Sequence, residues 1–220
     1  MTVAHAPAPS EVIARIDALG PGDWIATDCD GTLWRGDIGD DVVRAAAAEP
    51  EAFGLESCDF EAYEELIRAD YEGACLAACG VLRQADQAVA AAAIDRVLGA
   101  DFSPRVWLLE ALQDALKRGV EVWLVSASPR LAVQVGAKRV GIEPSQAIGI
   151  ELAESGYRAP WPIDTGKPAA CRSRGKSAPA VALGDTRWDM PLLQWASQGF
   201  MLTPADQDAH LLDSADSHRG

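Results

Sequence analysis

The amino-acid sequence predicts an α/β protein built on a doubly wound parallel sheet, with a helical cap inserted near the start of the chain. Strand-like apolar runs alternate with helical segments at both ends of the chain, which is typical of parallel sheets with right-handed crossovers. One long helical block interrupts this alternation between residues 37 and 100. Polar residues follow directly after three of the apolar runs, where open α/β sheets bind their ligands.

The first predicted helix begins near Ser10, a good N-terminal cap, and ends at Gly20. Residues 1–9 lack both a basic region and a long apolar run, so we expect a short flexible tail and no secretory signal. Asp23 to Thr27 then forms the first buried strand. The residues that follow this strand carry the strongest functional signal of the chain.

The Gly- and Asp-rich residues 31–40 are expected to form a loop, and the Ala- and Glu-rich residues 41–98 to be helical. Within that block the clearest helices are 61–78 and 84–98. We therefore expect a core domain of residues 1–36 and 101–220, with a cap of residues 37–100 between them.

The second half of the chain returns to alternation, with Ser103-Pro104 as a helix start and Gly119 as a stop. The remaining elements are predicted, in order, as helix 103–118, strand 120–125, helix 129–140, strand 147–152, helix 165–174, strand 178–183, helix 190–196 and strand 199–202. The polar tail from Ala205 is expected to pack loosely.

Charge and composition exclude several classes of partner. The net charge of −14 argues against a nucleic-acid or anionic-membrane surface, which needs clustered cations. No run of about eighteen apolar residues is present, so no membrane span is expected. The five cysteines show no metal-type spacing, and we expect reduced thiols and a cytoplasmic protein. Composition leaves the oligomeric state open.

Six polar side chains are expected to converge at one edge of the sheet because each lies at a strand end or a helix start. They are Asp28, Asp30, Ser126, Lys167, Asp185 and Asp189. Four carboxylates in one crevice repel one another unless a cation relieves them. An oxygen-rich site of this kind suits Mg²⁺, which also shares ligands with substrate phosphates. Lys176 competes with Lys167, but it lies only nine residues before Asp185, too few for a helix and a strand.

These motifs, in this order, resemble the haloacid dehalogenase (HAD) superfamily in its phosphatase form. The pattern is Asp28-x-Asp30-Gly31-Thr32, a strand that ends in Ser126, then Lys167, then Gly184-Asp185-x-x-x-Asp189. The helical insert between the first two motifs is similar to that of the phosphoserine-phosphatase-like branch. The resemblance implies a Rossmann-like core with a cap.

The resemblance also implies a role for each motif residue. Asp28 would attack phosphorus and form an aspartyl phosphate, and Asp30 would act as general acid and base. Ser126 and Lys167 would bind the phosphoryl group. The metal ligands would be Asp28, the backbone carbonyl of Asp30, Asp185 and Asp189. Asp189 could instead cap the following helix. True dehalogenases lack an acid at the position of Asp30, which favours phosphate ester hydrolysis.

Three residues are candidates for substrate specificity. The resemblance places Asp37 where phosphoserine phosphatases bind the substrate amine, although it could be a solvated loop acid. Arg68 could reach a substrate carboxylate or form an intrahelical pair with Glu64 or Glu65. Trp34 could face a cationic head group or simply pack.

The sequence therefore predicts a Mg²⁺-dependent phosphatase that acts on a small phosphate monoester and uses an aspartyl-phosphate intermediate. An amine-bearing substrate such as phosphoserine, phosphoethanolamine or phosphocholine is compatible with the candidate residues. Two alternatives stay open, which are a phosphotransferase or mutase with the same chemistry and a non-enzymatic module that binds a phosphorylated ligand.

Overall fold

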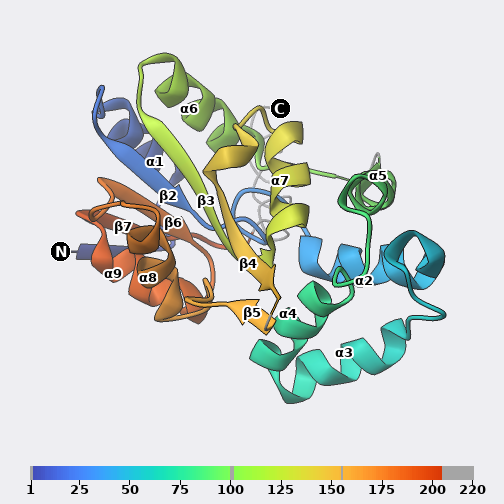
Figure 1. Cartoon of the computed structure of the whole chain (residues 1–220). Helices are drawn as coiled ribbons and strands as arrows, with labels where there is room; N and C mark the ends of the chain where they lie inside the picture. Colours follow the sequence, from blue (N-terminus) through green and yellow to red (C-terminus); the bar gives the residue numbers. More distant parts are fainter. Residues whose placement is uncertain (1, 100–101, 155, 205–220) are drawn as a thin grey trace, which may run out of the picture.

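The computed structural model describes residues 2–99, 102–154 and 156–204, and these residues form one seven-stranded sheet with helices on both faces (Figure 1). The strand order is β1-β7-β6-β2-β3-β4-β5. The strands are β1 (Thr2–His5), β2 (Trp24–Thr27), β3 (Glu121–Pro129), β4 (Ala147–Ala153), β5 (Gly156–Arg158), β6 (Val181–Gly184) and β7 (Gln198–Met201). All neighbours are parallel except β5, which pairs antiparallel with β4. The prediction of a doubly wound parallel sheet is confirmed.

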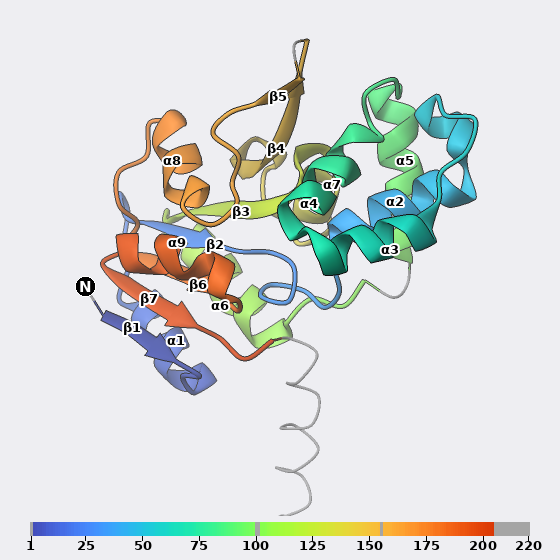
Figure 2. The same ribbon diagram turned by 90° about the horizontal axis from the view of Figure 1, so that it is seen from below.

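The sheet is buried on both faces because successive residues of a strand point to opposite sides. Ile25 of β2 packs with α1 (Pro9–Asp17), α6 (Val106–Lys117) and α7 (Arg130–Arg139). Its neighbours Trp24 and Ala26 pack with α8 (Gly166–Ser173) and α9 (Met190–Trp195) on the other face. Figure 2 shows these two helical layers on either side of the sheet.

The long segment between β2 and α6 is helical and contains no strand in its described residues 28–99 and 102–105. Its helices are α2 (Ile38–Ala48), α3 (Phe60–Ala69), α4 (Tyr71–Gly80) and α5 (Gln87–Leu98). They gather beside the carboxyl ends of β3 and β4 (Figure 1). The Tyr157 hydroxyl of β5 donates to the Leu76 carbonyl oxygen of α4 at 2.8 Å, which attaches this group to the sheet.

Two predictions about chain segments were wrong. Residues 2–5 are not a flexible tail but form β1, which pairs with Gln198–Met201 of β7. The partner is nearly the whole chain away, so local sequence could not indicate the strand. The predicted helix 61–78 is two helices, because Asp70 adopts an extended conformation and its carboxylate caps α4 by accepting from the Gly73 N–H at 3.0 Å.

Element boundaries near the strand ends also differ from prediction. Helix α2 begins at Ile38, inside the predicted loop, because Asp37 caps it by accepting from the Gly39 and Asp40 N–H groups. Helix α6 begins only at Val106, since Pro104 pairs with Trp34 in an antiparallel bridge. None of the helices in the described ranges is long and apolar enough to cross a membrane.

Candidate functional site

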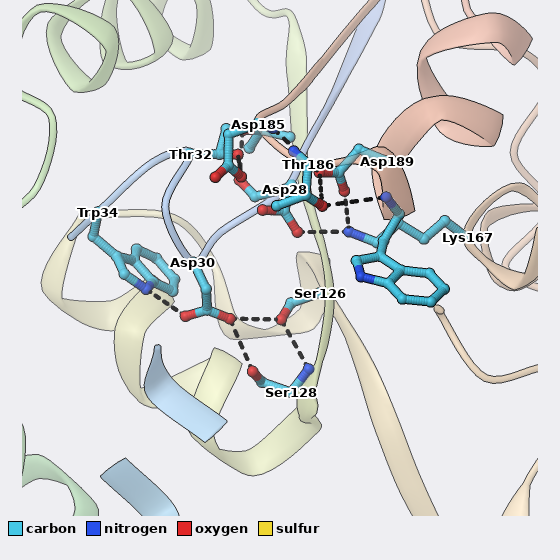
Figure 3. A network of polar contacts seen from close by, with 12 residues as sticks. Asp28, Asp30, Thr32, Trp34, Ser126, Ser128, Lys167, Asp185, Thr186 and Asp189 are labelled. Carbon is cyan, nitrogen blue, oxygen red and sulfur yellow. Dashed lines mark hydrogen bonds and ion pairs between the residues drawn. The ribbon is translucent and has the colours of Figure 1, made fainter. Parts of the chain in front are cut away.

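The candidate site lies where three neighbouring strands end, because β2 pairs with both β3 and β6. Asp28 follows β2, Asp185 follows β6, and Ser126 lies in the last part of β3. Lys167 reaches the same point from the first turn of α8. The structure thus brings together side chains that are up to 157 positions apart in the sequence (Figure 3).

Three carboxylates and one ammonium group form the centre of the site. Oxygens of Asp28, Asp185 and Asp189 lie within 4.8 Å of one another. The Lys167 Nζ is 2.6 Å from Asp28 Oδ1 and 2.5 Å from Asp189 Oδ1. Lys167 is only 2 % exposed, so bulk water does little to screen its attraction to these two carboxylates.

The two acids after β6 are held by the short turn that follows the strand. Asp189 Oδ2 accepts from the Thr186 N–H at 2.9 Å and from the Thr186 Oγ1 at 3.0 Å, so Asp189 also closes this turn. Asp185 Oδ1 accepts from the Thr32 hydroxyl at 2.7 Å. Gly31 must be glycine here, because its φ is +75° and a Cβ would come 2.4 Å from Asp185 Oδ2.

Burial and mutual repulsion perturb the acids of this centre. Burial raises the pKa of Asp28 well above its ordinary value, the Asp189 charge raises it further, and Lys167 opposes both. Burial likewise raises the pKa of Asp185 to about 6. Burial alone would lower the pKa of Lys167, but the Asp189 and Asp28 charges hold it above its ordinary value.

This donor set suits a divalent cation. Three carboxylates face one ammonium group, which leaves the centre with excess negative charge in the ionised state. A cation between them would favour the charged carboxylates and offset their desolvation. Carboxylate oxygens alone are the ligands of hard cations such as Mg²⁺.

Asp30 belongs to a separate group beside this centre (Figure 3). Its Oδ1 accepts from the Trp34 Nε1 and from the Ile38 backbone N–H, each at 2.8 Å. Its Oδ2 accepts from the hydroxyls of Ser126, at 3.0 Å, and Ser128, at 2.8 Å. The Asp30 carboxylate therefore faces the predicted phosphate-binding serine rather than the three clustered acids.

An irregularity in β3 presents the two serines. The pairing of β3 with β4 advances from Val125 to Pro129 on β3 but only from Ile148 to Ile150 on β4. Gly149 alone thus stands opposite residues 126–128, and a Cβ on it would lie 2.7 Å from the Ser128 carbonyl oxygen. This bulge needs glycine on the partner strand and re-aims the end of β3 toward Asp30.

A small cavity opens between α2, α3, α4 and the end of β3. Asp37 and Asp40 line it together with the rings of Tyr63 and Tyr71, and Ser128 forms part of its wall. The Tyr63 hydroxyl donates to Asp40 Oδ1 at 3.1 Å. Burial raises the pKa of Asp37 well above its ordinary value and raises that of Asp40 as well.

The three specificity candidates occupy different environments. Asp37 lines the cavity and caps α2, so it is not a solvated loop acid. Trp34 is 1 % exposed, its indole nitrogen is bonded to Asp30, and it is not among the residues that line this cavity. Arg68 is exposed on α3 and is not among the residues that line the cavity.

Several residues of the site were not predicted from the sequence. Ser128 was missed because it joins Ser126 through the irregularity between Val125 and Pro129, where simple strand alternation does not apply. Tyr71 stacks on Trp188 at a centroid distance of 5.3 Å, and nothing local indicates that contact across 117 positions. The Trp34–Asp30 hydrogen bond likewise depends on the closed turn between the two residues.

Comparison with known proteins places this geometry in context. A sequence model of haloacid dehalogenase-like hydrolases matches residues 25–194, which contain every motif residue discussed above. A search of the curated proteins found no match.

Solved structures share the fold at low sequence identity. A protein of unknown function from Bordetella pertussis Tohama I has a TM-score of 0.64 at 18 % identity, covering 88 % of this chain and 95 % of its own. A phosphoserine phosphohydrolase-like protein from Francisella tularensis subsp. tularensis SCHU S4 has 0.56 at 14 %, with 81 % and 86 % covered. A substrate-bound phosphoserine phosphatase has 0.52 at 18 %, with 84 % and 90 % covered.

Proposed function

Because this chain belongs to the haloacid dehalogenase-like hydrolase family, we propose that it is a Mg²⁺-dependent phosphatase that hydrolyses a small phosphate monoester. The observation that carries the proposal is the buried centre in which Lys167 bridges Asp28 and Asp189 beside Asp185. The fold that the chain shares with phosphoserine phosphatase supports the same reaction class.

The reaction would proceed in two displacements. One Asp28 oxygen attacks phosphorus while the bond to the leaving oxygen breaks, and Asp30 gives its proton to that oxygen. The alcohol departs, and Asp28 carries the phosphoryl group as an aspartyl phosphate. Water then attacks the same phosphorus and gives its proton to Asp30. Phosphate leaves, and both aspartates return to their starting states.

Electrostatic stabilisation of the phosphoryl group would come from the residues around it. Lys167 and Ser126 bind its oxygens, and Lys167 is already held in place by two carboxylates. Asp28, Asp185, Asp189 and the backbone carbonyl of Asp30 would hold Mg²⁺. When bound, this ion would neutralise charge on both the acids and the phosphoryl oxygens.

We propose an amine-bearing substrate, such as phosphoserine, phosphoethanolamine or phosphocholine. The cavity beside Ser128 carries two carboxylates, Asp37 and Asp40, and two aromatic rings, Tyr63 and Tyr71. Buried acids with raised pKa values favour a cationic ligand, because it restores their ionised form. Aromatic rings attract the same kind of group.

The helical segment of residues 37–100 would act as a cap over a core of residues 1–36 and 101–220. Helices α2, α3 and α4 line the cavity, so movement of this segment would admit substrate and exclude bulk water. The net charge of −14 favours a small phosphorylated metabolite over nucleic acid as the partner. Five free cysteines fit a reducing, cytoplasmic location.

The test is a phosphatase assay with p-nitrophenyl phosphate and a panel of phosphate esters, with Mg²⁺ and with a chelator. We expect Mg²⁺-dependent release of phosphate, with the highest kcat/KM for esters that carry an amine. The Asp28→Asn variant should lose at least about a thousandfold in kcat, because the nucleophile is gone. Asp114→Asn, a change to an exposed acid on α6, is the matched control and should keep full activity.

Two results would contradict the proposal. Near-normal activity of purified Asp28→Asn would remove the nucleophile assignment, and activity that persists in chelator would remove the metal. Transfer of phosphate to an added alcohol in preference to water would identify a phosphotransferase instead.

A further inference from the structure

The Asp30 carboxylate is surrounded by two chemically different pairs of partners. The Trp34 indole N–H and the Ile38 backbone N–H both donate to Oδ1. Neither group can accept a hydrogen bond, so neither could pair with a protonated Oδ1. The hydroxyls of Ser126 and Ser128 face Oδ2, and a hydroxyl can either donate or accept. The two oxygens of Asp30 are therefore not equivalent.

From this asymmetry, and resting on the proposed phosphatase function, we propose that Trp34 and Ser128 are positioning residues for the acid Asp30. The hydrogen bond from Trp34 favours the unprotonated form of Oδ1. Ser128 can donate to Oδ2 or accept from it, so Oδ2 is the oxygen that gains and loses the proton. Oδ2 is also the oxygen bonded to Ser126, the residue proposed to bind the phosphoryl group. Trp34 and Ser128 thus orient the Asp30 carboxyl so that Oδ2 transfers its proton to the leaving oxygen beside the bound phosphate.

Trp34 is rigid enough for this task. It is 1 % exposed and packs against the ring of Phe102 at a centroid distance of 5.4 Å. Its carbonyl oxygen accepts from the Gly31 N–H at 2.9 Å, which closes the turn that carries Asp30. Helix α7 blocks movement of the ring on one side, because a Cβ on Gly136 would lie 2.8 Å from Trp34 Cη2.

Ser128 is held equally well on the opposite side. Its backbone N–H donates to the Ser126 Oγ at 2.9 Å, and its own hydroxyl donates to Asp30 Oδ2. Ser128 is therefore bonded both to Asp30 and to Ser126, the other hydroxyl that binds Oδ2. It is 5 % exposed, and a Cβ on Gly39 of α2 would lie 3.0 Å from its Oγ. A side chain that is fixed by its neighbours on both sides can orient a catalytic carboxyl.

The test compares two substrates that differ in their need for an acid. Phosphoethanolamine has an alkoxide leaving group that must be protonated, whereas p-nitrophenolate leaves without a proton. Trp34→Phe and Ser128→Ala should slow the first-turnover release of ethanolamine about tenfold or more. The first-turnover release of p-nitrophenolate should fall less than about threefold, and KM should change little.

The controls separate positioning from general damage. Trp24→Phe is matched to Trp34→Phe, since Trp24 is also buried but its indole nitrogen has no hydrogen-bond partner among the described residues. Ser173→Ala is matched to Ser128→Ala, since among the described residues the Ser173 hydroxyl bonds only within its own helix, to Ala170. Both controls should leave the two rates unchanged.

A double-mutant cycle shows whether Ser128 acts through Asp30. Once Asp30→Asn has removed the acid, adding Ser128→Ala should cost nothing further. Additive losses, equal losses for the two substrates, or no loss in either variant would each overturn the inference. Should Trp34→Phe not fold, the Ser128→Ala comparison and the cycle decide alone. A wild-type protein inactive toward both substrates would instead contradict the phosphatase proposal itself.

Discussion

Among the described residues, the Lys167 ammonium is the only one bonded to any of the three clustered acids. It is shared between Asp28 and Asp189. A buried charge that loses its partner is strongly destabilising, so these groups depend on one another for stability as well as chemistry. Asp185 is outside this pairing. It accepts from the Thr32 hydroxyl, and one of its oxygens lies within 4.8 Å of an oxygen of each of the two paired acids.

Asp185 predicts a pH dependence of metal binding. Its pKa is raised to about 6, so it is ionised at pH 7.5 and largely protonated at pH 5. Because a metal ligand must lose its proton first, Mg²⁺ affinity should fall at least about tenfold between these two pH values. Isothermal titration calorimetry should also record proton release on binding at pH 5.

The matched variant for this measurement is Asp185→Asn, which cannot titrate. Its Mg²⁺ affinity should be weaker than that of the wild type at pH 7.5 and should depend less on pH. Equal wild-type affinity at both pH values would contradict the role of Asp185 as a ligand that binds in competition with protons.

At the scale of secondary structure, helix α7 is fitted closely to the turn that carries the acids. Gly136 faces Trp34 and Ile38, and a Cβ there would lie 2.8 Å from Trp34 Cη2 and 3.2 Å from Ile38 Cδ1. Glycine is a poor helix residue, so its position in α7 is explained by this contact rather than by local preference.

Gly136→Ala should therefore destabilise the protein. Helix propensity favours alanine by about 1 kcal/mol, but forcing a methyl group into a packed core costs about 1–3 kcal/mol. We expect a net loss of up to about 2 kcal/mol in the free energy of unfolding, measured by urea denaturation. Gly20→Ala, where nothing lies within 4 Å of the added Cβ, should be neutral or slightly stabilising. A more stable Gly136→Ala variant would contradict the packing argument.

The sequence predicted those elements whose signal is local. The strand that leads to Ser126 and the strand that ends just before Asp185 are predicted from apolar runs, because parallel strands are buried on both faces. The break at Asp70 was missed because a capping residue inside a helical run looks like an ordinary exposed acid. Strand β5 was missed because three residues carry too little pattern.

In the candidate site, too, the sequence predicted only the features that have a local signal. Strand ends were enough to predict that Asp28, Lys167 and Asp189 gather, since the topology of the fold fixes where those ends lie. They were not enough to connect Trp34 or Ser128 with Asp30. Those bonds depend on a closed turn and on a bulge whose partner is Gly149, and both are consequences of the assembled sheet.

At the scale of the whole molecule, most of the thiols are buried. Four cysteines are buried, and Cys58 alone is half-buried. Burial raises the pKa of Cys75, Cys79 and Cys171 to about 12, and that of Cys29 well above its ordinary value. At pH 8 these four thiols stay protonated and are at most 9 % exposed, and the protonated thiol is not nucleophilic.

A thiol-reactive chromogenic reagent at pH 8 should therefore modify one cysteine quickly in the native protein and five in denaturant. Cys58→Ser should remove the fast phase and leave the slow ones. Two or more fast-reacting thiols in the native wild type would show that the protein opens far more readily around its buried cysteines than their packing implies.

The pairing of β1 with β7 has a consequence for biosynthesis. Thr2 is in register with Gln198, so β1 has no partner strand until the chain 196 positions further on has been made. Contacts between such distant segments are slow to form, because a long loop must close before they contribute. We infer that this edge strand docks last, after translation of β7, and that the central strands beside the acids assemble without it.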